Sequence, residues 1–368
     1  MPVATAVAAA RALGVTRLAD ITGLDRIGLP VWQAVRPWGR SISVHQGKGI
    51  DADAARLGAC MEAIECSHAE NWQAPTLRAA FSDLPASERA ASPDDFAVRR
   101  GDTDEAALLA WTIARRLDGG VLWVPEAAVS LDLTRSGEAG VTRSSNGQGA
   151  GFAFEFAAVK ALCEVIERDA MAAWQAQPIF ARSNDEIDRQ TIDFSWFQRL
   201  QQRCAGLGVS IRVYRVPAAI AIPVFAAELH DASAEAAAYP HTAGSCAHLD
   251  AEAALRGAVF EAIQSRLTII AGAREDLPLG RPTALRPVFG LALARAGDPP
   301  PLRWHAAPLL GWHAAPPMAL DAIASALVAA GYPQAATVTL SPAQSPVVTV
   351  KAFVPGLGET RRARRAAA

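Results

Sequence analysis

The sequence predicts a mixed α/β fold, because helical and strand patterns alternate along its 368 residues and one local plan occurs three times. In this plan a turn of small residues leads into an Ala-rich helix that carries two polar side chains three residues apart. The expected turns are Gly47-Lys48-Gly49, Ser145 to Gly151, and Gly244-Ser245-Cys246. Glycines let a backbone turn tightly and approach a ligand closely. The repeated plan therefore favours one domain, residues 1–368, over several.

The three helices end in related motifs, which are Glu62-Ala63-Ile64-Glu65, Glu164-Val165-Ile166-Glu167-Arg168 and Glu261-Ala262-Ile263-Gln264. Residues three apart in a helix lie on one face with Cβ atoms roughly 5 to 6 Å apart. Each helix thus presents a pair of polar groups in one direction. The isoleucine within each motif is expected to face a sheet.

The N-terminal part is expected to hold a helix over residues 4–13, strands over 27–35 and 41–45, and a helix ending near Ala69. Asp51 is a predicted N-cap of that last helix, because its side chain can accept from an otherwise unpaired backbone N–H. Residues 1–40 would form an N-terminal helix and hairpin, and residues 41–275 the core.

The later elements follow from the same patterns. Residues 75–102 are predicted to be loop, and 132–150 lack periodicity before the central helix. Helices are expected over 104–117, 192–204, 251–271 and 319–330, and strands over 121–124, 209–216, 223–229, 336–340 and 347–353. Residues 278–317, rich in Pro, Arg and Trp, are expected to form a surface loop or a lid, and the basic run 361–365 a solvated tail. Residues 276–368 would complete the domain.

Composition excludes several classes of protein. Hydrophobic residues make up 51% of the sequence and charged residues 20%, which excludes a disordered chain. A net charge of -2 provides no overall positive potential for binding nucleic acid. No apolar run is long enough to cross a membrane. Five cysteines without a C-x-x-C pair are a poor disulfide framework, so a cytoplasmic protein is expected.

The glutamates indicate the chemistry. Carboxylates that converge from separate helices repel one another unless a cation neutralises them. Mg²⁺ prefers hard oxygen ligands and often bridges carboxylates and phosphates, so the pattern indicates a nucleoside triphosphate site. Lys48 and Arg168 would face the phosphates. A single Glu-x-x-Glu usually marks a solvated helix face, and only the combination of three carries this prediction.

Other reactive groups lack a supporting pattern. The histidines do not fall at zinc-ligand spacing, and the sequence contains neither a G-x-S-x-G elbow nor a P-loop. Cys163 and Cys246 lie close to the motifs, but small buried cysteines are common in protein cores. The sequence therefore assigns no catalytic nucleophile or base.

These motifs, taken together, resemble the signature stretches of the YcaO family. The resemblance rests on the three motif regions and on a closing stretch similar to that family's late strand, Lys351-Ala352-Phe353-Val354-Pro355-Gly356-Leu357. It implies a YcaO-type fold with mixed sheets, in which three Glu-bearing helices converge on one nucleotide site. It also implies an ATP- and Mg²⁺-dependent enzyme that phosphorylates the oxygen of a peptide backbone amide.

The resemblance also assigns residues. The implied Mg²⁺ ligands are Glu62, Glu65, Glu164, Glu167 and Glu261. The implied nucleotide contacts are Arg168, Gln264, Ser145, Asn146 and Lys48. The sequence departs from common family residues at Gly58, Gly149 and Phe152, and Cys66 stands where Arg often follows the second Glu.

The branch of the family determines the expected product. Residues 19–30 and 265–276 look like the TfuA-associated subgroup, which implies thioamide formation in a ribosomally made peptide or protein with a TfuA-like partner. The resemblance begins within about the first 20 residues, so we expect a partner to grip the precursor substrate. Two alternatives are an azoline-forming cyclodehydratase acting on Cys, Ser or Thr, and a non-catalytic adapter subunit. The sequence leaves the oligomeric state open, with a homodimer among the options.

Overall fold

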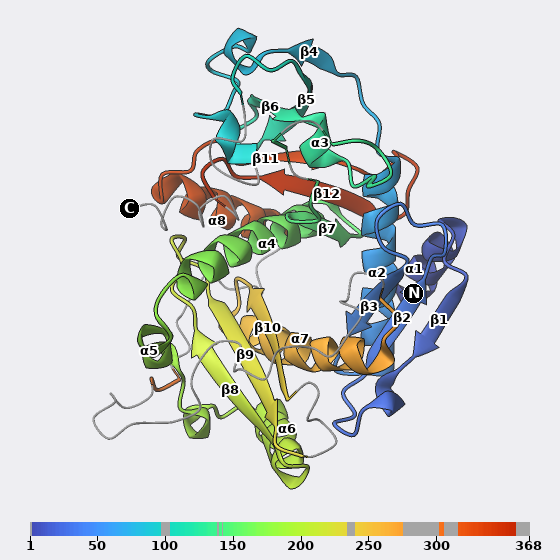
Figure 1. Ribbon diagram of the computed structural model, residues 1–368, viewed down its shortest axis with the longest axis vertical. Helices are drawn as coiled ribbons and strands as arrows, with labels where there is room; N and C mark the ends of the chain where they lie inside the picture. Colours follow the sequence, from blue (N-terminus) through green and yellow to red (C-terminus); the bar gives the residue numbers. More distant parts are fainter. Residues whose placement is uncertain are drawn as a thin grey trace.

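The computed structural model describes residues 2–96, 104–137, 140–141, 143–233, 240–274, 302–304 and 316–357, and Figure 1 shows their arrangement. Two of its sheets have three strands. One has the order β1-β2-β3, with β1 at Arg17–Asp20, β2 at Val31–Val35 and β3 at Val44–Lys48. The other has the order β10-β9-β8, with β8 at Val209–Arg215, β9 at Val224–Asp231 and β10 at His241–Ala247.

The third sheet has six strands in the order β4-β5-β11-β12-β7, with β6 paired to β5. These strands are β4 (Leu77–Ala79), β5 (Leu109–Arg116), β6 (Val121–Pro125), β7 (Gln148–Gly151), β11 (Ala336–Thr339) and β12 (Val348–Phe353). The helices are α1 (Pro2–Ala12), α2 (Ala52–Asn71), α3 (Glu126–Val129), α4 (Phe154–Gln175), α5 (Ile179–Arg182), α6 (Ser195–Gly206), α7 (Ala251–Ala271) and α8 (Pro316–Ala329). The named strands of the described chain all pair antiparallel.

The threefold plan of the sequence corresponds to three strand–helix units. Strands β3, β7 and β10 each lie at the edge of their sheet and are followed in the chain by α2, α4 and α7. Each helix also contacts the strand of another unit, α2 touching β7, α4 touching β10, and α7 touching β3. The three units therefore close into a ring, and Figure 1 shows α2, α4 and α7 around the middle of the molecule.

Glycines in these edge strands allow the strands to lie directly on the helices. The positions are Gly47, Gly149 and Gly244. A Cβ at Gly47 would lie 2.1 Å from both the Ala55 carbonyl oxygen and the Ala59 nitrogen. At the other two glycines the nearest helix backbone atoms would lie 2.3 and 2.4 Å from such a Cβ. Small residues are thus required here for packing between strand and helix.

The isoleucines of the three motifs confirm the predicted core face. Ile64, Ile166 and Ile263 are 0%, 1% and 0% exposed. Each belongs to a hydrophobic cluster that includes strand residues, such as Ala34 beside Ile64 and Val213 beside Ile263. The predicted N-cap is also confirmed, because the Asp51 carboxylate accepts from the Ala54 backbone nitrogen at 2.8 Å.

Two predictions of local structure were wrong. The small-residue turns at Gly47 and Gly244 are strand residues, and in the middle motif only the residues before Gln148 form a turn. The helix expected over 104–117 is instead strand β5. Its Trp111 and Ala114 are fully buried, and β5 pairs with β4, β6 and β11, so tertiary pairing overrides the apparent helical spacing.

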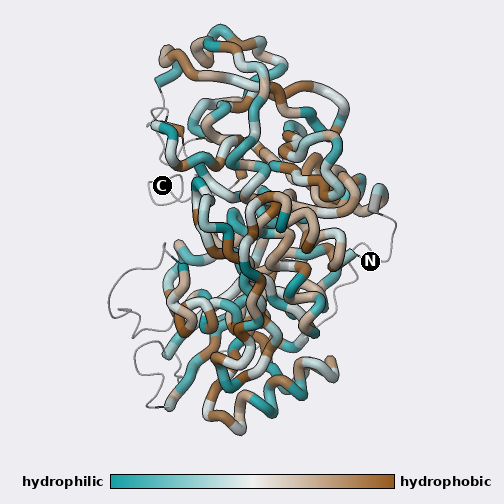
Figure 2. The backbone as a smooth tube through the Cα atoms, turned by 90° about the vertical axis from the view of Figure 1, so that its right-hand side faces the viewer, coloured by the Kyte–Doolittle hydropathy of each residue, from teal (hydrophilic) through white to brown (hydrophobic). Residues whose placement is uncertain are grey.

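The predicted loop over 75–102 was also wrong in part, because Leu77–Ala79 form strand β4 by pairing with β5. The other predicted helices and strands have the expected type, with ends shifted by a few residues. Residues 278–301 and 305–315 of the predicted lid or loop, and the predicted tail at 361–365, lie outside the described residues. Hydrophobic and hydrophilic residues alternate in short stretches along the tube of Figure 2. Among the described helices, none has the length and apolar character needed to span a bilayer.

Replacing Gly47 with alanine should destabilise the fold by at least about 2 kcal/mol, because the new methyl group would collide with backbone atoms that cannot move away independently. Urea unfolding of the Gly47→Ala variant measures this cost. Gly206→Ala, at the end of α6, is the matched control, since a Cβ there meets nothing within 4 Å. Equal stability of the two variants would contradict the proposed packing role.

Candidate functional site

The glutamates of the three motifs lie where the strand–helix units meet. Lys160 of α4 donates to Glu65 of α2, which joins the first two units. Ser245 of β10 donates to the Glu167 carboxylate of α4 at 2.6 Å, which joins the second and third. The three units therefore meet at carboxylates.

The ring closes through a third contact of the same kind. The Lys48 ammonium of β3 lies 3.0 Å from the Glu261 carboxylate of α7. Backbone donors hold two further carboxylates, because the Gln46 nitrogen donates to Glu62 at 2.7 Å and the Ala247 nitrogen donates to Glu167 at 3.1 Å. Each of these interactions holds a carboxylate of one of the three motif helices in place.

Burial and mutual repulsion make these carboxylates hard to ionise. Burial raises the pKa of Glu164 to about 8, and the charges of Glu167 and Glu65 add to this although Arg168 opposes it. Burial also raises the pKa of Glu167 to about 6, with the Glu261 charge adding to it. The pKa of Glu62 is raised by burial and by Glu65. The five carboxylates thus form one electrostatically coupled group.

Two lysines neutralise part of this group. Burial lowers the pKa of Lys48, but the charge and hydrogen bond of Glu261 outweigh it and leave the pKa above its usual value. The pKa of Lys160 is raised in the same way, by Glu65 and then Glu164 against the effect of burial. These two ammonium groups thus balance part of the negative charge of the carboxylates.

The residues before β7 form the turn that the sequence assigned to nucleotide binding. The Ser144 hydroxyl accepts from the Asn146 nitrogen at 3.0 Å, and Gly147 has a φ of +77°, which favours glycine. Ser145 is exposed. The Asn146 side-chain oxygen is buried and has no hydrogen-bond partner among the described residues, so it is available to a ligand.

The structure brings most of the predicted site residues together. The five glutamates and Lys48 are linked by the contacts above. The Arg168 guanidinium lies 3.4 Å from the Glu164 carboxylate on the same helix. Because 48% of its side chain is exposed, Arg168 contacts the carboxylates from the solvent side. Gln264 is half-buried one turn beyond Glu261, and its carbonyl accepts from Thr268.

The third motif is displaced relative to the other two. In the first two helices, the backbone nitrogens of Ala59 and Ala161 face a strand glycine. Glu62 and Glu164 each come three residues after that nitrogen. In α7 the equivalent nitrogen belongs to Ala262, so Glu261 lies one helical turn earlier than its counterparts. Similar motif sequences therefore lie at different positions along their helices relative to the glycine of the neighbouring strand.

Two residues near the carboxylates, Lys160 and Lys351, were missed from the sequence. Lys351 of β12 is 2% exposed and donates to the Ser144 carbonyl. Burial lowers its pKa to about 8, although the Glu164 charge acts in the opposite direction. The sequence did contain a signal for both residues. It has only three lysines, and Lys160 and Lys351 are the two that the sequence analysis did not place in the site.

The donor set fits Mg²⁺ in its chemistry. Carboxylate oxygens are the ligands this ion prefers, and it usually takes one or two of them together with phosphate oxygens and water. Consistent with that, no three acidic, histidine or cysteine side chains of the described chain lie close enough together to enclose a metal by themselves. A bound Mg²⁺ would therefore complete its coordination with the nucleotide.

The cysteines are unsuited to nucleophilic chemistry. Four of them are buried and Cys246 is partly buried. Burial raises the pKa of all five thiols, that of Cys163 to about 12 and that of Cys204 to about 11, with the remaining three also raised. The chain thus presents no activated thiolate.

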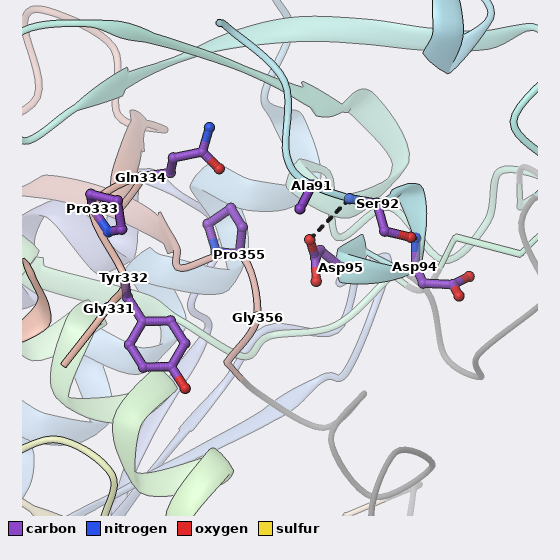
Figure 3. Close-up of a pocket in the computed structure, with 10 residues that line it drawn as sticks. All are labelled: Ala91, Ser92, Asp94, Asp95, Gly331, Tyr332, Pro333, Gln334, Pro355 and Gly356. Carbon is purple, nitrogen blue, oxygen red and sulfur yellow. Dashed lines mark hydrogen bonds between the residues drawn. The ribbon is translucent and has the colours of Figure 1, made fainter. Parts of the chain in front are cut away.

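A cavity of about 530 Å³ lies away from the glutamates, between residues 91–95, 331–334 and 355–356 (Figure 3). Asp94, Asp95 and Tyr332 are among its lining side chains, and no lysine or arginine of the described chain lines it. Its charge is therefore wrong for a phosphate group.

The departures from common family residues have structural explanations at two positions. A Cβ at Gly58 would lie 3.2 Å from the Gly47 Cα, and Gly149 packs against α4. Both glycines are thus part of the strand–helix packing. Phe152 is 43% exposed, and nothing in the described structure explains its identity.

Comparisons with known proteins agree with this geometry. The family description "YcaO cyclodehydratase, ATP- and Mg²⁺-binding" matches residues 46–358. A protein of Rhizobium leguminosarum bv. trifolii, called an uncharacterized protein in the tfuA 3′ region, is 33% identical over 94% of this chain and 84% of its own length. An uncharacterized protein of Methanothermobacter thermautotrophicus is 34% identical over 72% of this chain and 68% of its own length.

Solved structures share the fold at low sequence identity. YcaO from Methanopyrus kandleri, bound with AMPPCP and Mg²⁺, aligns with a TM-score of 0.70 at 19% identity, over 99% of this chain and 93% of that one. A heterocyclase in complex with substrate and cofactor aligns with a TM-score of 0.74 at 19% identity. The alignment covers 94% of this chain but spans only half of the heterocyclase chain.

Replacing Glu164 with glutamine should stabilise the ligand-free protein at high pH. The pKa of Glu164 is about 8 in the folded state, against a usual value of 4.5. Between pH 4.5 and pH 8 the folded state therefore binds more protons than the unfolded state, so the free energy of unfolding falls as the pH rises. The variant should therefore exceed the wild type at pH 8 by on the order of 2 kcal/mol, and match it near pH 4.

Urea unfolding without Mg²⁺ at the two pH values measures this difference. Glu252→Gln, in the first turn of α7, is the control, because Glu252 is partly exposed and its partners are Arg256 and the Trp196 indole, outside the group of five carboxylates. If Glu164→Gln and Glu252→Gln show the same pH dependence, the coupling of the carboxylates is not what destabilises the ligand-free protein.

Proposed function

This chain belongs to the YcaO family, and we propose that it activates a backbone amide of a peptide or protein with Mg²⁺-bound ATP so that sulfur replaces the amide oxygen. As a family member it is an ATP-dependent peptide-modifying enzyme. The thioamide product is the part of the proposal that goes beyond family membership.

One observation carries the nucleotide part of the proposal. Five carboxylates from three helices are fixed side by side although burial and repulsion raise the pKa values of Glu62, Glu164 and Glu167. Such an arrangement destabilises the ligand-free protein and becomes favourable only when cations arrive. A purely structural role would not explain why acidic side chains are used at these positions.

The proposed contacts follow from the placement of the residues. Glu62, Glu65, Glu164, Glu167 and Glu261 would hold Mg²⁺, and Ser145, Asn146, Arg168, Gln264 and Lys48 would contact the nucleotide. Bound ATP with Mg²⁺ would supply the phosphoryl group that makes the amide oxygen a leaving group. The protein's own contribution would be to position the reactants and to balance charge.

The overall exchange requires a sulfur donor. Sulfide sulfur forms a bond to the amide carbon, and the former carbonyl oxygen leaves with the transferred phosphoryl group as phosphate. The five cysteines are buried or partly buried and burial raises their pKa, so we propose a sulfur donor outside this chain. A sulfide donor and the precursor substrate are therefore separate components of the reaction.

A TfuA-like protein is the partner that we propose. Its support is the Rhizobium relative in the tfuA 3′ region, which is similar over 94% of this chain. The precursor peptide or protein would be presented with the help of that partner.

Azoline formation is the second candidate. The family description names a cyclodehydratase, and a heterocyclase shares the fold. The same amide activation would serve both reactions. They differ only in the nucleophile, which for an azoline is a neighbouring Cys, Ser or Thr side chain of the substrate.

Mass spectrometry of the precursor after incubation with the enzyme, a TfuA-like protein, ATP, Mg²⁺ and sulfide distinguishes the products. Thioamidation exchanges one oxygen for one sulfur, whereas azoline formation removes one water. Glu167→Gln should abolish either modification, because the amide carries no negative charge and keeps only one of the two oxygens that accept from Ser245 and Ala247, and Glu252→Gln should retain it. Loss of water in place of sulfur gain would contradict thioamidation, and full activity of Glu167→Gln would remove the metal-ligand assignment.

A further inference from the structure

Lys351 is a buried cation that forms no ion pair with an acidic side chain of the part of the chain that the structure describes. It lies on β12 with 2% of its surface exposed, and its ammonium donates to the Ser144 carbonyl. No ion pair joins it to an acidic side chain of the described chain. The other two lysines differ, since Lys48 pairs with Glu261 and Lys160 with Glu65. Lys351 therefore keeps donor capacity that the described residues do not use.

Burying an ammonium group in this way is unfavourable. The group carries three donors, and one of them is accounted for by Ser144. The Glu164 charge acts on Lys351 without forming an ion pair with it, and a buried charge without a direct ion pair is costly. Burial accordingly lowers the pKa of Lys351 to about 8. A function that needs a cation at this point would explain why the position does not hold an apolar residue.

A second unused donor lies beside it. Gln148 of β7 is directly opposite Lys351 in the antiparallel pair, and opposite residues share one face of a sheet. Gln148 is 3% exposed, and its amide nitrogen has no hydrogen-bond partner among the described residues. Two buried donors thus lie together at the start of β7, next to the Ser144–Gly147 turn.

The three lysines of this chain all lie near the glutamates of the candidate site. The sequence has three lysines against 32 arginines, and all three interact electrostatically with the glutamates of the site. Lysine supplies a compact point charge with donors that rotate freely, and it binds phosphate in this way. The face shared by Lys351 and Gln148 lies toward α2, because the Lys351 charge is felt by Cys66 and its neighbour Thr349 contacts His68.

We propose that Lys351 and Gln148 form an anion subsite that takes terminal phosphate oxygens of the nucleotide beneath the Ser144–Gly147 turn. The subsite rests on the proposed function and adds two residues to it. Lys351 would bridge the turn and the phosphate, donating to the Ser144 carbonyl on one side and to the ligand on the other. The Gln148 amide would donate alongside it.

Calorimetry tests the subsite with two probes, Mg²⁺-ATP and magnesium tripolyphosphate. Lys351→Met and Gln148→Leu should each weaken binding of both probes by about tenfold or more, because a hydrogen bond to a charged oxygen is lost. Arg256→Met, which removes a surface cation of α7, should bind both probes like the wild type.

Urea unfolding of the ligand-free variants separates a binding role from a structural one. The Lys351→Met midpoint should equal or exceed that of the wild type, because removing a buried charge that has no direct ion pair outweighs the loss of the hydrogen bond to the Ser144 carbonyl. A lowered midpoint together with weakened binding would show that Lys351 only supports the turn, and would overturn the subsite.

The two probes also separate this proposal from the function on which it rests. Wild-type affinity for Mg²⁺-ATP in both Lys351→Met and Gln148→Leu would overturn the subsite and leave the nucleotide site standing. Binding of tripolyphosphate but not Mg²⁺-ATP by the wild type would contradict the proposed function and, with it, a subsite for the phosphate oxygens of the nucleotide. A wild type that binds neither probe would overturn both.

Discussion

The burial of carboxylates that also repel one another is the constraint around which this structure is arranged. Two like charges a few ångströms apart in a partly desolvated site cost far more than they do in water. The protein accepts this cost at five glutamates and limits it with backbone N–H donors, a serine hydroxyl and two lysines. The strand–helix units determine where the carboxylates lie, and the units in turn depend on glycines that let edge strands touch helix backbones.

The contacts that relieve this repulsion are also those that close the ring. Lys160 with Glu65 and Lys48 with Glu261 each connect neighbouring units. The assembly of the fold and the charge balance of the site are therefore coupled. In our proposal, arrival of Mg²⁺ and a nucleotide would give the glutamates a stronger cation and would free these ammonium groups to face phosphate.

The sequence alone predicted the parts of the fold that follow from local pattern. The motif helices, their buried isoleucines and the Asp51 cap are confirmed, because helical periodicity and capping are encoded by neighbouring residues. Strand β5 was predicted as a helix because its identity depends on pairing with the following strand β6 and with β4 and β11 from more distant parts of the chain. The glycines were read as ligand-binding turns because packing against a helix and contact with a ligand both require a small residue.

The candidate site could be predicted only as far as its motifs extend. The five glutamates belong to three similar helices and were recognisable, whereas Lys160 and Lys351 belong to no repeated pattern and are brought to the site by the fold. The displacement of Glu261 by one turn relative to its strand is likewise a property of helix packing.

Calorimetric titration of the intact chain and of Glu164→Gln/Glu167→Gln with ATP, with and without Mg²⁺, tests the central claim most directly. The account predicts binding that requires Mg²⁺ in the intact chain and is lost in the double variant. Binding of equal strength in both proteins, or no binding at millimolar ATP by the intact chain, would contradict a nucleotide site built on these carboxylates, and the latter result would favour an adapter subunit.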